Sequence, residues 1–269
     1  MKLNIQQPKK NEPTLIVVGC LHGNEIVGKK VINELKKLKI IKGKLITIIG
    51  NPIAVNAKKR FIGQDLNRSF PGNKNSHILE EKIAYNILQN ISKKDYVVDI
   101  HSTSSDTEDV VIVKKKDEVV NKIIKLINPK RVVLMPKDYG NGSLINFCHG
   151  ISIEYGKHSD KKTFIKSLND IKLLMCNLKM LANCPTKIEP HTKFKVIPNT
   201  EFYEVFGTEP KPEGFKLDSN IKNFEYVQKG QVLGSINKGL IFAKEGFYPV
   251  LFGEKAYKDI IGFKAIKIN

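Results

Sequence analysis

Residues 14–25 read TLIVVGCLHGNE, an aliphatic run that ends in a turn carrying a histidine and a glutamate. A continuously apolar run of this length is typical of a strand buried on both faces, as in the parallel sheets of α/β proteins. The turn holds His22 and Glu25 three residues apart, and we expect Gly23 to let the backbone bend tightly between them. By itself the stretch fits an ordinary strand-to-helix turn, so the role of its polar side chains depends on the rest of the chain.

The same pattern recurs through the first two-thirds of the sequence. Further apolar runs typical of strands lie at 44–50, 95–101, 110–113, 131–135 and 150–156, and amphipathic stretches typical of helices lie at 25–38, 76–91, 117–127 and about 160–182. Strands that alternate with helices predict an α/β fold, in which a mostly parallel or mixed sheet is flanked by helices on both faces.

The pattern changes at Cys184-Pro185. Beyond this point short apolar runs such as KFKVI, EFYEVF and QVLGSI alternate with proline and glycine turns, and helical periodicity is weak except near 254–259. We therefore expect two domains. Residues 1–185 would form the α/β domain, and residues 186–269 a smaller all-β domain.

The chain is strongly basic, with a formal net charge of +18 over 269 residues. Its lysine and arginine pairs are scattered, and nothing in the sequence resembles a recognition helix or the aromatic pairs of an RNA-binding sheet. We therefore expect no nucleic-acid partner. A positive field would instead draw a small anionic substrate toward a cleft.

Several expectations follow from what the sequence lacks. No run approaches the ~18 apolar residues that span a bilayer, and the first ten residues lack the apolar centre of a signal peptide. We therefore expect a cytoplasmic protein without a membrane partner. The four cysteines show no C-x-x-C spacing, which predicts free, mostly buried thiols. No heptad pattern specifies an interface, so the sequence does not decide whether the protein forms a homo-oligomer.

Reactive side chains collect at the ends of the expected strands. His22 and Glu25 follow the first strand, His101 ends the run at 95–101, and Glu154 lies in the run at 150–156. Ligands bind beyond the carboxyl ends of strands in sheets of this kind. Two histidines and one carboxylate, with a position left for water, are the requirement of a catalytic zinc site. We therefore predict that His22, Glu25 and His101 bind one Zn²⁺ per chain.

Each of these residues also has an ordinary structural explanation. His101 alone would be a core or loop histidine, and Glu25 alone a first-turn acid that the helix dipole favours. The metal hypothesis therefore rests on the whole set.

The set resembles a known family. His22-x-x-Glu25 and His101, together with GNP, DLNRSFPG, DIHST and IEYG, are similar to the zinc carboxypeptidase clan. More narrowly, the chain resembles the succinylglutamate desuccinylase/aspartoacylase family. That resemblance rests on HGNE, on Arg60 seven residues before Asn67, and on EGFYPVLFGEKAYKD at 245–259, which looks like the segment that closes over the substrate.

The resemblance implies that residues 1–185 are the catalytic domain and that residues 186–269 cap its active-site cleft. Together with the chemistry, it also assigns roles to further residues. Zinc lowers the pKa of its water to about 7 and polarises a carbonyl. Glu154 would take the proton of the water, and Arg60 would stabilise the oxyanion. By resemblance, Arg68 and Asn67 hold the α-carboxylate of the amino-acid part, for which the planar guanidinium is suited. By resemblance, Tyr248 matches a tyrosine that contacts the substrate in aspartoacylases. An aromatic residue that only packs within a sheet is an equal alternative for Tyr248.

Two aspartates are candidates for supporting roles. Asp99 precedes His101 by two residues, so on a strand it shares the same face and could orient that ligand, although a plain buried acceptor fits as well. Asp65 could orient the loop in which it lies, or one of the nearby arginines.

One departure from the family concerns the substrate. Familiar aspartoacylases carry a further arginine about ten residues before the catalytic glutamate, and 138–149 contains none here. Lys137, Asn141 or Ser143 could substitute or could be turn residues. This puts N-acetylaspartate in doubt as the substrate.

Taken together, these residues predict a zinc-dependent hydrolase that cleaves the amide bond of a small N-acylated amino acid. Two alternatives stay open: a zinc carboxypeptidase that acts on peptides, and a non-catalytic metal-binding or sensing protein on the same fold.

Overall fold

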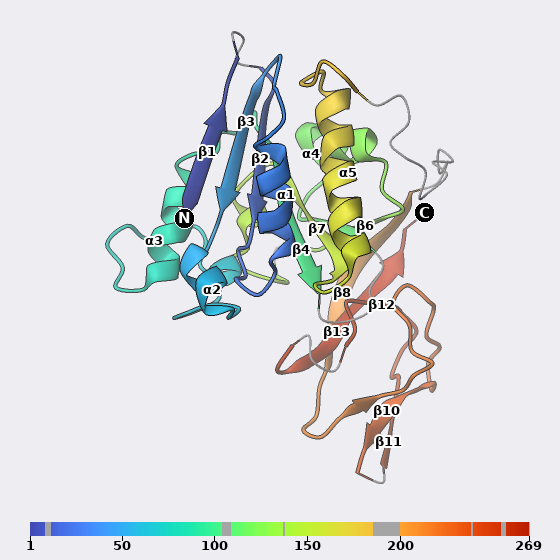
Figure 1. The fold of residues 1–269 in the computed structure, drawn as a ribbon. Helices are drawn as coiled ribbons and strands as arrows, with labels where there is room; N and C mark the ends of the chain where they lie inside the picture. The colour runs from blue at the N-terminus through green and yellow to red at the C-terminus, as the bar shows by residue number, and fades with distance from the viewer. Residues whose placement is uncertain are drawn as a thin grey trace.

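A mixed sheet of ten strands forms the centre of the molecule in the computed structural model, which describes residues 1–8, 12–103, 109–136, 138–184, 200–237, 239–253 and 257–268 (Figure 1). In spatial order its strands are β1 (Lys2–Gln6), β3 (Lys44–Ile49), β2 (Thr14–Gly19), β4 (Tyr96–Thr103), β7 (Gly150–Lys157), β5 (Val110–Val113), β6 (Arg131–Leu134), β8 (Glu201–Pro210), β13 (Ile260–Lys267) and β12 (Tyr248–Val250). A separate antiparallel sheet joins β9 (Lys216–Leu217), β10 (Val232–Ile236) and β11 (Gly239–Phe242). The predicted fold class is confirmed.

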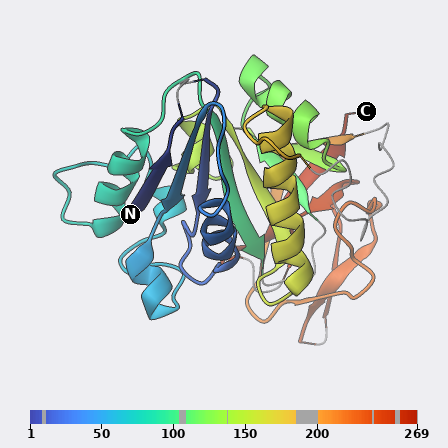
Figure 2. The same ribbon diagram turned by 45° about the horizontal axis from the view of Figure 1, so that its top comes forward.

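Helices cover both faces of the large sheet, as the unbroken apolar strands predict. The helices are α1 (Val27–Leu35), α2 (Pro52–Ala57), α3 (Leu79–Leu88), α4 (Glu118–Ile127) and α5 (Lys161–Asn177). Because side chains alternate along a strand, Leu15 and Val17 of β2 share a core with α1, α4 and α5, whereas Ile16 and Val18 pack with α3. Figure 2 shows α1 and α5 across the same face of the sheet.

Four strands at the centre decide where a site can form. β3, β2, β4 and β7 run parallel, so their carboxyl ends meet at one edge. β5 runs antiparallel to β7 and parallel to β6, so the carboxyl ends of β5 and β6 point away from this edge. Residues that face each other across β4, β7 and β5 form rows on one face of the sheet. His101, Glu154 and Val110 form one such row, and Asp99, Ser152 and Ile112 form the next.

The C-terminal strands contribute to both sheets. β8 pairs in parallel with β6, and β13 and β12 follow it, so these three strands extend the large sheet. The small sheet has a core of its own that includes Phe215, Leu233 and Phe247, and it extends from one end of the molecule (Figure 1). The expected domain boundary at 185/186 and the expected KFKVI strand lie outside the described residues. Residues 254–256 of the possible helix near 254–259 lie outside them too, and 257–259 are not helical. The two-domain division stays a prediction.

The expectation of four free thiols is wrong for two of the cysteines. Residues after α5 turn back, so the Cα atoms of Cys176 and Cys184 lie 5.5 Å apart, and the two form a disulfide. Cys20 and Cys148 are buried thiols, as expected. None of the helices in the described part of the chain is both long and apolar enough to cross a membrane.

Candidate metal centre and active site

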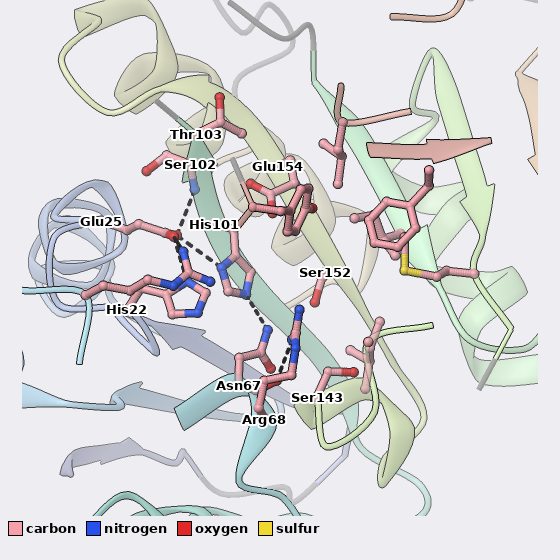
Figure 3. A pocket seen from close by; sticks show the side chains of 18 of the residues that line it. His22, Glu25, Asn67, Arg68, His101, Ser102, Thr103, Ser143, Ser152 and Glu154 are labelled. Carbon is pink, nitrogen blue, oxygen red and sulfur yellow. Dashed lines mark hydrogen bonds and ion pairs between the residues drawn. The ribbon is translucent and has the colours of Figure 1, made fainter. Parts of the chain in front are cut away.

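Three buried side chains converge at the edge where the parallel strands end. His22 and Glu25 lie in the turn after β2, and His101 lies on the neighbouring parallel strand β4. One nitrogen or oxygen from each side chain lies within 4.8 Å of the other two. Figure 3 shows the three side chains pointing toward one another. The structure therefore brings together all three predicted zinc ligands.

The carboxylate of Glu25 lies between the two imidazole rings. Its Oε1 is 2.6 Å from Nδ1 of His22, and its Oε2 is 3.0 Å from Nδ1 of His101. The main-chain N–H of Ser102 also donates to Oε2 at 3.0 Å. Both histidines thus turn the same ring nitrogen, Nδ1, toward the shared space.

The outer nitrogen of each imidazole faces another carboxylate. Nε2 of His22 is 2.9 Å from Oδ1 of Asp65, and Nε2 of His101 is 2.6 Å from Oδ2 of Asp99. A carboxylate in this position holds the proton on Nε2 and leaves Nδ1 available to a metal. The structure therefore agrees with the orienting role considered for Asp99 and gives Asp65 the same role toward His22.

The electrostatics of this cluster favour a positive charge within it. Burial disfavours the charged form of His101, but the negative charges of Asp99 and Glu25 outweigh it and raise the pKa of the imidazole. Burial likewise opposes ionisation of Glu25, yet His22 and His101 hold the pKa of its carboxyl well below the usual range. Two imidazoles and a carboxylate, backed by two more carboxylates, suit a divalent cation, and these ligand types fit an open zinc site.

Arg60 lies beside the ligands on the segment after α2. Its Nε and Nη2 donate to Oδ2 of Asp65 at 3.1 and 2.9 Å, and its Nη1 is 3.8 Å from Oε1 of Glu25. The main-chain N–H of Gly23 donates to the carbonyl of Arg60 at 2.9 Å and so ties its segment to the ligand turn.

The role of Gly23 differs from the expected tight bend. Its backbone is not in the left-handed region, and a Cβ atom there would lie only 2.2 Å from the main-chain carbon of Ala54. Glycine therefore fits this position because the ligand turn and α2 approach each other closely.

Asn67 and Arg68 belong to a short 3₁₀ helix, Leu66–Arg68. Asp65 caps it by accepting a hydrogen bond of 2.9 Å from the N–H of Asn67. The side-chain oxygen of Asn67 accepts from the N–H of Leu144 at 3.0 Å, and Nη1 of Arg68 donates to the carbonyl of Asn67 at 2.7 Å. The loop geometry thus presents both side chains to the same cavity.

Glu154 lies on β7 directly opposite His101 in the strand register (Figure 3). Its Oε2 is shielded from solvent and has no hydrogen-bond partner among the described residues. Burial, partly offset by the charge of His101, raises the pKa of this carboxyl to about 7. A carboxylate with a free oxygen and a pKa in this range can accept a proton at neutral pH.

One cavity of about 270 Å³ contains these groups. The three candidate ligands line it together with Arg60, Asn67, Arg68 and Glu154. The apolar part of the lining is made of Ile112, Met135, Ile145, Leu251 and Phe263. Leu251 and Phe263 come from the C-terminal part of the chain, which therefore narrows the cavity.

The structure places Tyr248 away from this cavity. Its ring packs against Tyr203 and Tyr226, with centroids 5.4 and 5.2 Å apart, and the cavity lining seen in the described residues does not include it. Tyr257, from the same 245–259 segment, lines the cavity instead. The assignment of Tyr248 to the substrate thus loses its support, because β12 directs that ring into a cluster of aromatic side chains.

Sequence reasoning also missed Lys114 and His158, which line the cavity. Lys114 follows an apolar run, but it belongs to a lysine triple that reads as an ordinary basic stretch. Of the substitutes considered for the missing arginine, Ser143 lines the cavity and Asn141 is exposed outside it. Lys137 lies outside the described residues.

Comparison with known proteins adds an independent result. Residues 11–152 match the family model of the succinylglutamate desuccinylase/aspartoacylase catalytic domain. A probable aspartoacylase of Prochlorococcus marinus (strain MIT 9515) is 26% identical over 279 residues, covering 93% of this chain and 91% of that protein. An N-acyl-aromatic-L-amino acid amidohydrolase of Xenopus laevis is 30% identical over 132 residues, which are 44% of this chain and 43% of the relative.

Solved structures show the same fold. Murine aminoacylase 3 superimposes with a TM-score of 0.75 at 19% identity, covering 97% of both chains. An ectoine utilization protein from Ruegeria pomeroyi superimposes with a TM-score of 0.74 at 18% identity, covering 98% of this chain and 88% of that one. The similarity in fold therefore extends through the C-terminal strands as well as the residues around the candidate metal centre.

Proposed function

Because the chain belongs to the succinylglutamate desuccinylase/aspartoacylase family, we propose that it is a zinc-dependent hydrolase of small N-acylated amino acids. The observation that supports this most directly is the position of Glu154. Glu154 lines the same cavity as the three converging ligands and has an unpartnered carboxylate oxygen, as a general base for hydrolysis needs.

His22, Glu25 and His101 would hold the zinc ion, which when bound supplies a Lewis acid and lowers the pKa of water. Glu154 takes a proton at its free carboxylate oxygen from the water whose oxygen attacks the carbonyl carbon of the amide. It then gives this proton to the amide nitrogen as the carbon–nitrogen bond breaks. The products are a carboxylate from the acyl group and the free amino acid.

Three further side chains act on the substrate. Arg60, beside Glu25, donates to the carbonyl oxygen as negative charge develops on it. Arg68 donates to the α-carboxylate of the amino-acid part, and Asn67 stands beside it to do the same. These contacts place the amide between the ligand set and Glu154.

The cavity favours a small substrate over a peptide. Its volume of about 270 Å³ is at the lower end for a small-molecule site, and C-terminal residues such as Leu251 wall one side. A carboxypeptidase needs room for the rest of the peptide on the acyl side of the bond.

The decisive experiment combines metal analysis with one substitution. The purified protein should contain or take up about one zinc per chain, and it should hydrolyse at least one member of a panel of N-acetyl, N-succinyl and N-formyl amino acids. Glu154→Gln should bind the same zinc yet lose about 10²- to 10⁴-fold in kcat. Glu225→Gln changes a largely exposed carboxylate outside the cavity and serves as the control.

Three results would count against the proposal. Hydrolysis retained by Glu154→Gln would remove Glu154 from its role. Cleavage of short peptides in preference to N-acyl amino acids would favour the carboxypeptidase. A folded protein that binds zinc and hydrolyses none of these compounds would favour a sensor.

A further inference from the structure

His158 lines the cavity but has no role in the proposed mechanism. It follows the last residue of β7, and its main-chain N–H donates to the carbonyl of Thr103, the last residue of β4, at 3.0 Å. Nδ1 of its ring is 2.8 Å from Oγ of Ser102. Main chain and side chain of His158 are therefore both bonded to the end of β4, which fixes the half-buried ring in the cavity.

A β-bulge between β4 and β7 precedes His158. After the pair of His101 and Glu154, β7 has one residue more than β4. Within this bulge Gly156 has a φ of +92°, which glycine adopts without strain. Bulges change the direction of a strand and of the side chains beyond them. The bulge therefore explains how a residue just beyond β7 brings its ring back over Ser102 and into the cavity.

Two sides of the His101 ring face two ends of the cavity. Its Nε2 is 3.4 Å from the side-chain nitrogen of Asn67, which precedes Arg68 in the 3₁₀ helix. Its Nδ1 is 3.0 Å from Oε2 of Glu25, the atom that also accepts from the N–H of Ser102. Figure 3 shows the same order, with Arg68 and Ser102 on opposite sides of His101. The end of the cavity at Ser102 is therefore the end away from Arg68.

The proposed orientation of the substrate assigns the Ser102 end to the acyl group. In the proposed function Arg68 holds the α-carboxylate, and the carbonyl carbon lies between the candidate ligands and Glu154. The rest of the acyl group is bonded to this carbon on the side away from the amino acid. It therefore extends toward Ser102, where it meets the ring of His158.

Building on the proposed function, we propose that the ring of His158 closes the acyl end of the cavity and restricts the enzyme to short acyl groups, formyl or acetyl. Hydrogen bonds of 2.8 and 3.0 Å connect the ring to Glu25 through Ser102, so the ring lies near the place of the scissile carbonyl. A longer acyl chain would need the space that the ring occupies.

The charge of the ring agrees with this restriction. Burial lowers the pKa of His158, so the imidazole is uncharged at neutral pH. An uncharged ring offers no counter-ion to the terminal carboxylate of a succinyl group. Both the bulk of the ring and its neutrality therefore disfavour N-succinyl substrates.

Binding to an inactive variant tests the restriction separately from hydrolysis. Calorimetry would use zinc-loaded Glu154→Gln and the amino acid whose N-acetyl derivative this variant binds most tightly. That derivative should bind about tenfold or more tightly than the N-butyryl and N-succinyl derivatives, because one excess methylene group in a closed pocket costs about 10- to 200-fold. Adding His158→Ala should remove most of this difference.

Two control variants separate the bulk of the ring from a general effect on the fold. His158→Phe keeps a ring of similar size and should keep the preference for acetyl. His77→Ala removes an exposed histidine outside the cavity and should keep it too. In the active enzyme the ratio of kcat/KM between acetyl and butyryl substrates should follow the same pattern, whereas a merely structural change would alter both substrates alike.

Three results would overturn the restriction. Equal binding of N-acetyl and N-butyryl derivatives by Glu154→Gln would show that the acyl end is open. A full preference retained after His158→Ala would show that another group closes it. Loss of the preference in His158→Phe would assign it to the hydrogen bond with Ser102 and not to the bulk of the ring.

The binding pattern also separates this proposal from the proposed function. Selective binding of N-acetyl derivatives that depends on His158, together with a lack of hydrolysis by the unmodified protein, would refute only the proposed reaction. A lack of binding by every N-acyl amino acid in the panel would refute both proposals.

Discussion

The carboxylate of Asp65 joins His22 to Arg60. Its Oδ1 lies 2.9 Å from Nε2 of His22, and its Oδ2 lies 2.9 Å from Nη2 of Arg60. The same side chain caps the 3₁₀ helix that carries Asn67. One acidic residue therefore orients a candidate metal ligand, the proposed donor to the oxyanion and the start of the loop proposed to bind the substrate.

We predict that Asp65→Asn weakens zinc binding and turnover together. The amide keeps the shape of the carboxylate, but it removes the negative charge that His22 and Arg60 share. Loss of an outer hydrogen-bond partner of a metal ligand typically costs 10- to 100-fold in metal affinity or activity. Competition with a chelator would measure zinc affinity, and steady-state assays would give kcat.

The matched control for this variant is Asp218→Asn. That carboxylate accepts a hydrogen bond from the N–H of Asn220 in an exposed turn, so zinc affinity should not change. Zinc affinity of Asp65→Asn equal to that of the unmodified protein would show that His22 is oriented without Asp65.

The convergence of the candidate metal ligands could be predicted from the sequence because of how parallel strands are arranged. β2 and β4 are parallel neighbours in which Gly19 pairs with Ile100, so the turn after one strand meets His101 on the other. Each strand is also unmistakable, since its apolar run is unbroken. A rule about strand ends therefore predicts that His22, Glu25 and His101 lie together, as they do in the structure.

The same rule fails for Lys114 and for the C-terminal region. β5 runs antiparallel to β7, so its carboxyl end does not meet the edge where Glu154 lies, and periodicity contains no information about strand direction. Nor does it say that β8 pairs with β6. Tyr257 lies in the segment between β12 and β13, and the sequence pattern does not tell that Tyr257, and not Tyr248, lines the cavity.

The raised pKa of Glu154 predicts the pH dependence of the reaction. The base must be ionised, and its pKa of about 7 means that activity falls as the pH drops through this range. A cation bound nearby favours the carboxylate, so the acid limb of kcat/KM should lie at or below about pH 7. Glu154→Asp, which keeps a carboxylate, should retain an acid limb in its residual activity, and Glu154→Gln should lack one. An acid limb unchanged in Glu154→Gln would assign it to another group.

Glu80 holds the loop that carries Arg60, and we predict that it acts as a positioning residue. Its buried Oε1 accepts from the main-chain N–H of Ile62 and Gly63 at 2.9 and 3.2 Å, and from Asn51 at 3.2 Å. Glu80→Ala would leave these donors without a partner, which should cost about 2–4 kcal/mol of stability and loosen the loop.

The readout that separates positioning from stability is the kinetic profile of folded protein. Glu80→Ala should lower kcat well below the value of the unmodified enzyme at a temperature where both are fully folded, with KM little changed. Glu80→Gln keeps an acceptor oxygen and should recover most of that loss. Equal kcat for Glu80→Ala and the unmodified enzyme would show that the loop holds Arg60 without this carboxylate.

Asp170 should make the fold less stable as the pH rises. It lies on α5 with Oδ2 2.9 Å from Nζ of Lys166, and burial raises its pKa to about 6 although the charge of Lys166 opposes the shift. The folded protein therefore binds this proton more tightly than the unfolded chain, whose aspartate titrates near 3.9. The free energy of unfolding should then fall between about pH 4 and pH 6, by up to about 3 kcal/mol from this group, and level off above pH 6.

Asp170→Asn removes this titration. The difference in unfolding free energy between the unmodified protein and this variant, measured in urea from pH 4 to pH 6, therefore isolates the effect. A difference that is constant or rises with pH would mean that the charge of Lys166, and not burial, controls the ionisation of Asp170.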